Sequence, residues 1–143
     1  MREYEAIFKQ AMANGRCPYP FQARLATAEA FPSVLAIPTG LGKTAAAVLG
    51  WIYRRRFSKL HRDKTPRRLV YCLPMRTLVE QTHREVQTWL KRLGMWSEGA
   101  GLKFGADDSF VTANGDLGEG SVGVHLLMGG EDESDWWLQP ERD

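Results

Sequence analysis

The chain of 143 residues is long enough to fold as one ordinary domain. Its 43% hydrophobic and 25% charged residues exclude a disordered protein and are typical of a soluble globular one. No apolar run is long enough to span a bilayer, and the first residues lack the apolar core of a signal peptide. Cys17 and Cys72 form neither a C-x-x-C pair nor a disulfide framework. The sequence therefore predicts a cytoplasmic protein with no membrane partner.

The net charge of +2 hides an uneven distribution of charge along the chain. Basic residues crowd one short stretch in which only Asp63 opposes them: Arg54, Arg55, Arg56, Lys59, Arg62, Lys64, Arg67 and Arg68. From Asp107 to the end the balance is acidic. This asymmetry predicts one phosphate-facing surface. A solvated helix end and loop is the alternative interpretation of the basic stretch.

Apolar residues at helical spacing predict a first helix from Tyr4 to Met12, which Asn14-Gly15 ends. Two prolines forbid regular helix in the turn-rich segment 17–20, and a second helix is expected from residue 21 to about residue 30. These elements form an N-terminal segment, residues 1–32. The apolar run of residues 33–37 then predicts a strand that is buried on both faces of a sheet. A glycine-bearing turn follows, and after it a helix from residue 43 to about residue 56.

Beyond an exposed basic connection, residues 68–73 predict a second strand. A long helix from about residue 77 to residue 93 carries its apolar residues on one face and has Gly94 as its C-cap. Residues 94–121 are expected to be a flexible insertion, and residues 122–127 to be a third strand. This order predicts an α/β fold, a parallel sheet with right-handed crossovers and flanking helices, in which residues 33–143 form part of one lobe. Ligands of such sheets bind at the carboxyl ends of the strands, where each candidate motif lies.

Residues 37–44, Ile-Pro-Thr-Gly-Leu-Gly-Lys-Thr, have the spacing of a P-loop, although Ile37 stands where the general pattern has glycine. Gly40 and Gly42 let backbone N–H groups turn toward a phosphate. Lys43 is expected to reach the β- and γ-phosphates of ATP, and the Thr44 hydroxyl to ligate Mg²⁺, which makes these two the candidate catalytic residues. An ordinary strand-to-helix turn is the alternative. The predicted nucleotide-binding residues are Pro38, Thr39, Gly40, Leu41, Gly42, Lys43, Thr44 and Gln22.

Several segments resemble the motifs of superfamily 2 helicases. Residues 38–44 match the PTGxGKT form of motif I, and residues 74–81 resemble motif Ia, P-T-R-x-L-x-x-Q, with Met75 in place of the usual Thr. Tyr19-Pro20-Phe21-Gln22 resembles the Q-motif, in which Gln22 would read the adenine edge, and a simple helix start is the alternative. The resemblance implies a P-loop NTPase (RecA-like) fold. It also implies a nucleic-acid-binding face made by the motif Ia loop and a GG element: Pro74, Arg76, Thr77, Gly129 and Gly130.

The segments 124–130 and 134–143 resemble the stretch before the Asp-Glu box in the CRISPR-associated helicase–nuclease of type I systems. This resemblance implies a helicase recruited by an RNA-guided surveillance complex in antiviral defence. Such a helicase reels in single-stranded DNA from 3′ to 5′ for a His-Asp metal nuclease. Because a helicase motif lies so near the first residue, the nuclease domain is expected downstream or on a separate chain.

A working helicase also needs an Asp-Glu pair for Mg²⁺ and arginines from a second lobe. Glu131-Asp132-Glu133 follows Gly-Gly in a predicted loop and is rejected as that pair. The first helicase lobe is therefore expected to be incomplete, and the 143-residue chain alone to bind nucleotide weakly and not to hydrolyse it. Two alternatives stay open: a non-catalytic helicase-like binding module, and another superfamily 2 translocase of repair or restriction. His61 shows no partner in the sequence, and Trp136-Trp137 fits either core packing or DNA stacking.

Overall fold

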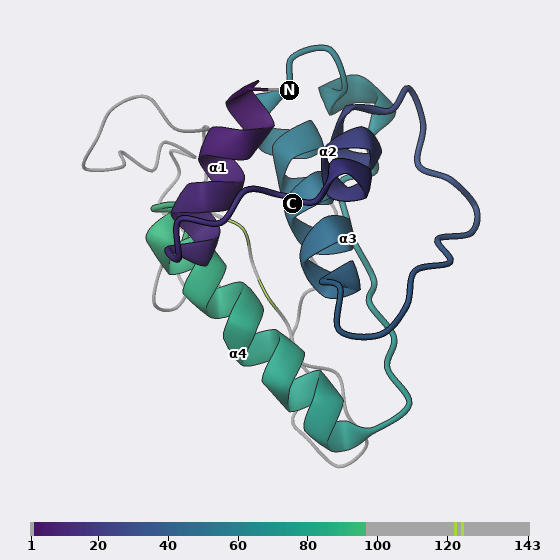
Figure 1. The fold of residues 1–143 in the computed structure, drawn as a ribbon, viewed down its shortest axis with the longest axis vertical. Coiled ribbons are helices and arrows are strands. Elements are labelled where there is room, and N and C mark those ends of the chain that lie inside the picture. Colours follow the sequence, from purple (N-terminus) through teal and green to yellow (C-terminus); the bar gives the residue numbers. More distant parts are fainter. Residues whose placement is uncertain (1, 97–121, 123, 125–143) are drawn as a thin grey trace, which may run out of the picture. The chain divides into compact units, whose positions relative to one another are not determined.

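The structure, a computed structural model, describes residues 2–96, 122 and 124 of the chain. It separates into two compact units, Met1–Leu69 and Val70–Asp143. The first unit contains the helices α1, α2 and α3 and the two short helices η1 and η2, and the second contains α4 (Figure 1). No described helix is long and apolar enough to cross a membrane.

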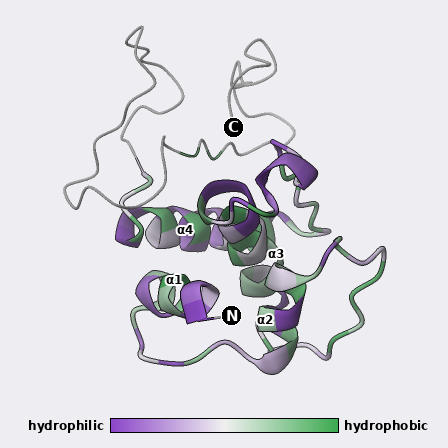
Figure 2. Cartoon of the chain, turned by 90° about the horizontal axis from the view of Figure 1, so that it is seen from above, coloured by the Kyte–Doolittle hydropathy of each residue, from purple (hydrophilic) through white to green (hydrophobic). Residues whose placement is uncertain are grey.

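Helix α1, Arg2–Met12, forms because its apolar residues recur every three or four positions. Glu3 and Glu5 in the first turn and Lys9 in the last turn complement the helix dipole. The alternation of hydrophilic and hydrophobic residues along α1 is visible in Figure 2. This helix confirms the predicted one. Its buried face consists of Tyr4, Ile7, Phe8 and Ala11.

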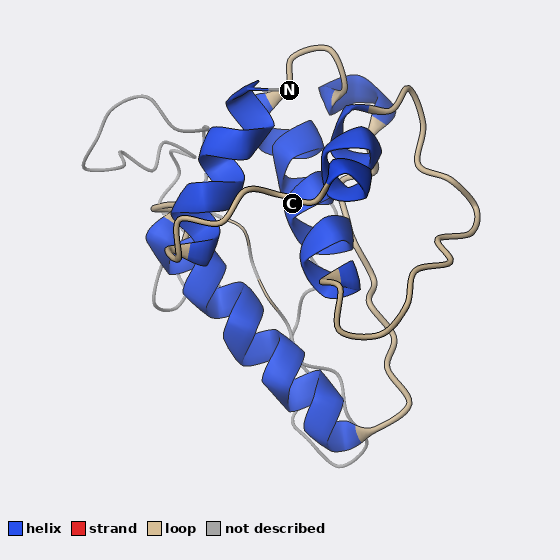
Figure 3. Ribbon diagram, viewed as in Figure 1, coloured by secondary structure: helices blue, strands red, loops and turns tan. Residues whose placement is uncertain are grey.

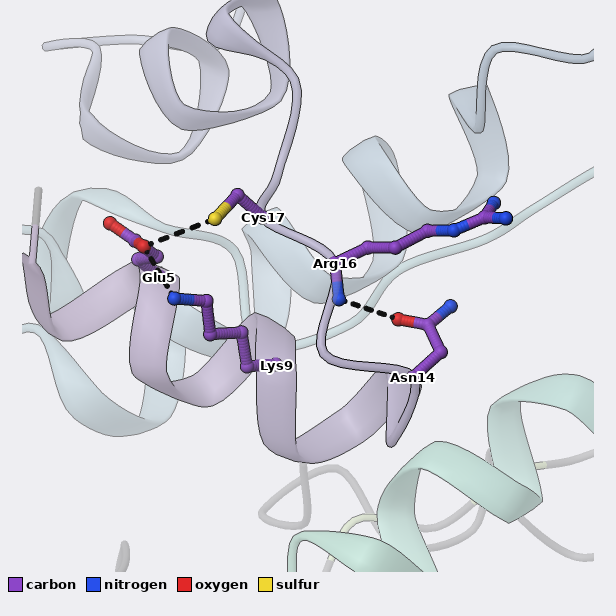
Figure 4. A network of polar contacts seen from close by, with 5 residues as sticks. All are labelled: Glu5, Lys9, Asn14, Arg16 and Cys17. Atoms are coloured by element: carbon purple, nitrogen blue, oxygen red, sulfur yellow. Dashed lines mark hydrogen bonds and ion pairs between the residues drawn. The ribbon is translucent and has the colours of Figure 1, made fainter.

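A turn after α1 sends the chain toward α2 (Figure 4). Ala13 and Gly15 both take positive φ angles, 51° and 68°, which end the helix near the predicted Asn14-Gly15. The Asn14 Oδ1 atom accepts a 3.1 Å hydrogen bond from the backbone N–H of Arg16. The Glu5 carboxylate links the residues on the two sides of this turn. It accepts a 2.7 Å hydrogen bond from Lys9, before the turn, and a 3.4 Å hydrogen bond from the Cys17 thiol, after it.

Helix α2, Pro20–Thr27, begins with proline at its first turn, where the missing N–H costs no hydrogen bond. It ends earlier than the predicted residue 30, because Ala28 adopts an extended conformation with ψ of 153°. The carbonyl oxygens of Ala28 and Glu29 accept hydrogen bonds from the Arg54 guanidinium, where a continued helix would supply backbone N–H donors. A side chain that is distant in sequence thus sets this helix end.

Helix α3, Lys43–Ile52, packs against α2. Gly50 faces Ala26, because a Cβ atom at Gly50 would lie 3.8 Å from the Ala26 Cα. These small residues allow the two helix backbones to approach closely. The remaining buried positions of α3 supply the bulk of the core in this unit: Val48, Leu49, Trp51 and Ile52.

The predicted helix up to residue 56 is one α-helix followed by a π-helical turn, η1, Tyr53–Phe57. The N–H of Ser58 donates to the Tyr53 carbonyl at 2.9 Å, five residues back. Tyr53 also ties η1 to α1, through an edge contact with the Tyr4 ring at 5.4 Å and a 3.2 Å hydrogen bond to Glu3. A short 3-10 helix, η2, Arg62–Lys64, follows.

Helix α4, Arg76–Arg92, is the described helix of the second unit and confirms the predicted long helix. Val86, Trp89 and Leu90 are buried along its inner face. Gly94, with φ of 69°, closes the helix as predicted: its N–H bonds the Lys91 carbonyl, and the Met95 N–H bonds the Leu90 carbonyl at 2.8 Å. This is the Schellman arrangement, with Met95 and Leu90 both fully buried beside it.

The predicted parallel sheet is not confirmed, because residues 2–96, 122 and 124 form helices and loops but no strand (Figure 3). Residues 33–38 and 68–73 are irregular, and Val34 and Val70 are 78% and 70% exposed instead of buried. A continuous apolar run fits a buried strand only where neighbouring strands and helices cover both of its faces. Apart from Val122 and Val124, the third expected strand lies outside the described residues, as does most of the expected insertion.

Candidate nucleotide-binding site

The loop of residues 38–42 has the backbone geometry that a phosphate cradle requires. Gly40 and Gly42 have φ angles of 82° and 74°, in the left-handed region that favours glycine. A Cβ atom at Gly40 would meet nothing within 4 Å, whereas one at Gly42 would lie 2.9 Å from the Gln22 Nε2 atom. The first glycine is therefore required by conformation alone, and the second by conformation and by space.

Helix α3 begins directly at the end of this loop, with Gly42 as its N-cap and no capping side chain. The N–H groups of the first helical turn lack partners within the helix, and they carry the positive end of the helix dipole. Thr44 lies half-buried in that turn. A curled glycine loop leading into an uncapped helix start is the arrangement that binds phosphate groups.

The Lys43 side chain lies back across the loop. Its Nζ atom donates a 2.9 Å hydrogen bond to the backbone carbonyl of Ile37, the residue just before the loop. The ammonium group is thereby held at the loop that it would serve. Phosphate binding would exchange this neutral carbonyl for anionic oxygens, which form stronger charge-assisted hydrogen bonds.

Gln22 connects the start of α2 to the loop. Its side chain is 2% exposed, its Oε1 atom accepts a 2.8 Å hydrogen bond from the Tyr19 N–H, and its Nε2 atom donates a 3.0 Å bond to the Gly42 carbonyl. Each end of the amide keeps capacity for one more hydrogen bond. Tyr19, 50% exposed, stacks on Phe21 with the ring centroids 6.0 Å apart. The structure thus brings Gln22 and the loop together as one assembly.

Arg54 is a buried residue of this unit that sequence reasoning grouped with the exposed basic stretch. It is 1% exposed, and its guanidinium donates hydrogen bonds to the carbonyls of Ala28 and Glu29 and to the Thr65 hydroxyl, the last two at 3.1 and 3.3 Å. The guanidinium also lies 4.7 Å from the centre of the Phe31 ring. Burial lowers the pKa of Arg54. Its position three residues after buried Trp51 was the signal that could have revealed it.

His61, which showed no partner in the sequence, has one in the structure. Its Nδ1 atom lies 2.6 Å from the Ser58 hydroxyl, and the Thr65 hydroxyl donates a 2.7 Å bond to the His61 carbonyl. Burial lowers the pKa of His61, and the nearby charges of Arg54 and Lys64 lower it further. The neutral imidazole is therefore part of the packed interior of this unit.

The chain was compared with known protein families. The model of the DEAD/DEAH box helicase family matches residues 19–116, which is more than half of the chain. The chain belongs to the DEAD/DEAH box helicase family. No curated protein and no solved structure matches it. Family membership implies a RecA-like P-loop fold, ATP-dependent helicase activity and the use of ATP with Mg²⁺.

The region matched by the DEAD/DEAH box helicase model begins at residue 19 and takes in Gln22, the P-loop and residues 74–77, but not α1. Residues 74–77 lie in the second unit. Pro74, Arg76 and Thr77 are exposed, and Arg76 forms a 3.3 Å ion pair with Glu80. Because Met75, the N-cap of α4, offers no capping side chain, the N–H groups of that first turn lack a side-chain cap. Gly129, Gly130 and Trp136-Trp137 lie outside the described residues.

In this DEAD/DEAH box helicase chain, Thr44 is the described residue that would bind Mg²⁺. Among the described residues, no group of three His, Cys, Asp or Glu side chains could hold a metal. Mg²⁺ in nucleotide sites keeps several waters and is bound by one or two protein oxygens plus substrate phosphates. A single hydroxyl at the start of α3 fits such a site.

Proposed function

We propose that this chain is the ATP-binding N-terminal segment of a superfamily 2 helicase or translocase that acts on DNA. The observation that carries the proposal is the assembly of the glycine loop, Lys43 and the start of α3, held to α2 by Gln22. A strand-to-helix turn without a ligand needs neither two left-handed glycines nor a lysine bent across them. A non-catalytic module would gain nothing evident from Lys43 and Thr44.

Each residue of the loop has a distinct task in this proposal. Gly40 and Gly42 turn the backbone N–H groups inward, and the α3 dipole favours the negative charge of the phosphates. Lys43 leaves the Ile37 carbonyl and moves to the β- and γ-phosphates of ATP. Thr44 would hold Mg²⁺ through its hydroxyl, and the ion would supply positive charge to the phosphates. Gln22 keeps the loop against α2 and offers its remaining donor and acceptor to the adenine.

The finer proposal is that the helicase reels in single-stranded DNA for degradation in CRISPR interference. It is supported by the likeness of residues 124–130 and 134–143 to the helicase–nuclease of type I systems. Its partners would be single-stranded DNA, an RNA-guided surveillance complex, and a nuclease domain downstream or on a separate chain. Retention of the chain on a type I surveillance complex loaded with target DNA, and not on the unloaded complex, would support this proposal; equal retention on both would contradict it.

Nucleotide binding is tested first on the chain itself, by saturation-transfer NMR with ATP and Mg²⁺, because this method detects weak ligands. We expect a signal on the adenine protons of ATP that Lys43→Ala largely removes. Lys43→Arg is the matched control, since it keeps the charge but changes its reach. A signal of equal strength in the wild type and in Lys43→Ala would sink the proposed site. Hydrolysis by the isolated chain is not expected.

A further inference from the structure

The basic stretch of the first unit carries seven cationic side chains that the nucleotide site does not use. We call this set the basic surface, and it consists of Arg55, Arg56, Lys59, Arg62, Lys64, Arg67 and Arg68. Lys59, Lys64, Arg67 and Arg68 are exposed, and the other three are half-buried. Within residues 54–68 only Asp63 carries a negative charge. Figure 2 shows the hydrophobic colour of α3 giving way to this hydrophilic segment.

Backbone and side-chain bonds fix the shape of this segment. The guanidinium of Arg55 donates to the Arg62 carbonyl at 3.2 Å, and the guanidinium of Arg62 donates to the Arg55 carbonyl at 3.2 Å. This reciprocal pair closes η1 onto η2, and the buried Ser58–His61 contact lies inside the closed turn. The fold thus holds like charges close together, an arrangement that costs free energy through repulsion.

The location of the basic surface separates it from the P-loop. The P-loop ends at Thr44, in the first turn of α3, and the basic surface begins at Arg55, beyond the last residue of α3, with ten residues between them. At about 1.5 Å per residue, the helix places them roughly 15 Å apart along its axis. Most of these cations are therefore too far away to neutralise the phosphates of a nucleotide held at Lys43. Arg54 is buried in the fold, Arg55 and Arg62 donate to each other's backbone carbonyl, and the Lys64 Nζ atom lies 3.9 Å from the Glu29 carboxylate. The exposed positive charge of the surface is carried by Lys59, Lys64, Arg67 and Arg68.

We propose that the basic surface binds the phosphate backbone of a nucleic acid, as a contact separate from residues 74–77. Its four exposed cations are Lys59, Lys64, Arg67 and Arg68, and ammonium and guanidinium groups both form charge-assisted hydrogen bonds with phosphate oxygens. The aromatic side chains within residues 54–68 are Phe57, which is half-buried, and His61, which is buried, so no described ring in this segment offers a stacking platform. Binding is therefore independent of base sequence and strongly dependent on salt. We favour a nucleic acid over an acidic protein as the partner, because Leu60 is the one large apolar side chain that is exposed within residues 54–68.

The test is a fluorescence-anisotropy titration of a labelled single-stranded oligonucleotide with the 143-residue chain at several KCl concentrations, without nucleotide. The variant Lys59→Glu/Lys64→Glu/Arg67→Glu is compared with Arg2→Glu/Arg16→Glu/Arg24→Glu, a matched charge change at exposed positions of the same unit. We expect at least tenfold weaker binding and a flatter salt dependence, by about two in slope, in the first variant only. Equal loss in both variants, or loss in neither, overturns the proposal.

A footprint on the wild-type chain guards against a variant that fails to fold. Saturating oligonucleotide should protect Lys59 and Lys64 from acetylation, measured by mass spectrometry, and leave Lys9 of α1 unprotected. Protection by polyglutamate but not by the oligonucleotide would overturn the proposal in favour of an acidic protein partner. Because neither experiment contains ATP, a failure of the proposed nucleotide site leaves both results unaffected, and the two failures can be told apart.

Discussion

The side-chain amide of Gln22 donates a 3.0 Å hydrogen bond to the carbonyl of Gly42, the residue at which the P-loop becomes α3. The other end of the same amide accepts from the Tyr19 N–H at 2.8 Å. A single buried side chain therefore sets both the start of α2 and the position of the loop. An adenine base that Gln22 binds would contact a side-chain amide whose orientation these two hydrogen bonds already fix.

Replacing Gln22 should weaken the first unit and the loop together. Gln22→Ala removes both hydrogen bonds and leaves two backbone groups without this partner, so we expect a loss of about 1–3 kcal/mol in the free energy of unfolding. Gln22→Glu keeps an acceptor for the Tyr19 N–H but sets a carboxylate against the Gly42 carbonyl. Urea denaturation of both variants measures the cost. An unchanged midpoint in Gln22→Ala would show that the amide does not join α2 to the loop.

The two P-loop glycines should differ in their tolerance of alanine. Both φ angles are positive, so each substitution costs about 1–2 kcal/mol in backbone strain. Gly42→Ala also places a methyl group 2.9 Å from the Gln22 amide nitrogen, whereas Gly40→Ala meets no atom within 4 Å. We expect Gly42→Ala to be the more destabilising, and its excess cost to shrink in a Gln22→Ala background. Equal costs in the two backgrounds, by urea denaturation, would contradict the crowding argument.

The sequence predicted the helices and the loop well, because these features depend on local chemistry. Gly94 was expected to cap α4 and does so with a positive φ angle, and Lys43 was expected at the start of α3. The buried strands were not confirmed. The apolar run at Val34 predicts burial, but strand pairing depends on distant partners that a local pattern does not contain. Arg54 was missed for the same reason, since the backbone carbonyls that it binds lie 25 to 28 positions away along the chain.

Arg54 should be the most stabilising basic residue of the stretch. Arg54→Met removes the donor that ends α2, so we expect a loss of about 2–4 kcal/mol in the free energy of unfolding. Arg54→Lys should recover only part of it, because a lysine ammonium lacks the planar fork that serves the Ala28 and Glu29 carbonyls together. Lys59→Met, at an exposed neighbour, is the control and should change the free energy of unfolding by less than about 0.5 kcal/mol. Similar losses in Arg54→Met and Lys59→Met would show that the Arg54 contacts are not stabilising.

The stability of the first unit should depend on pH through His61. Burial, Arg54 and Lys64 hold the pKa of His61 in the folded chain below its ordinary value of 6.5. The unfolded chain then binds the proton more readily than the folded chain, so stability is full above pH 6.5 and falls as the pH is lowered through the folded pKa. Urea denaturation at pH 7.5, 6.5 and 5.5 measures the decline. His61→Gln removes the titrating group but leaves the other two histidines, and we expect a smaller decline in that variant over the same range. If the wild type and His61→Gln lose stability equally on acidification, another group is responsible.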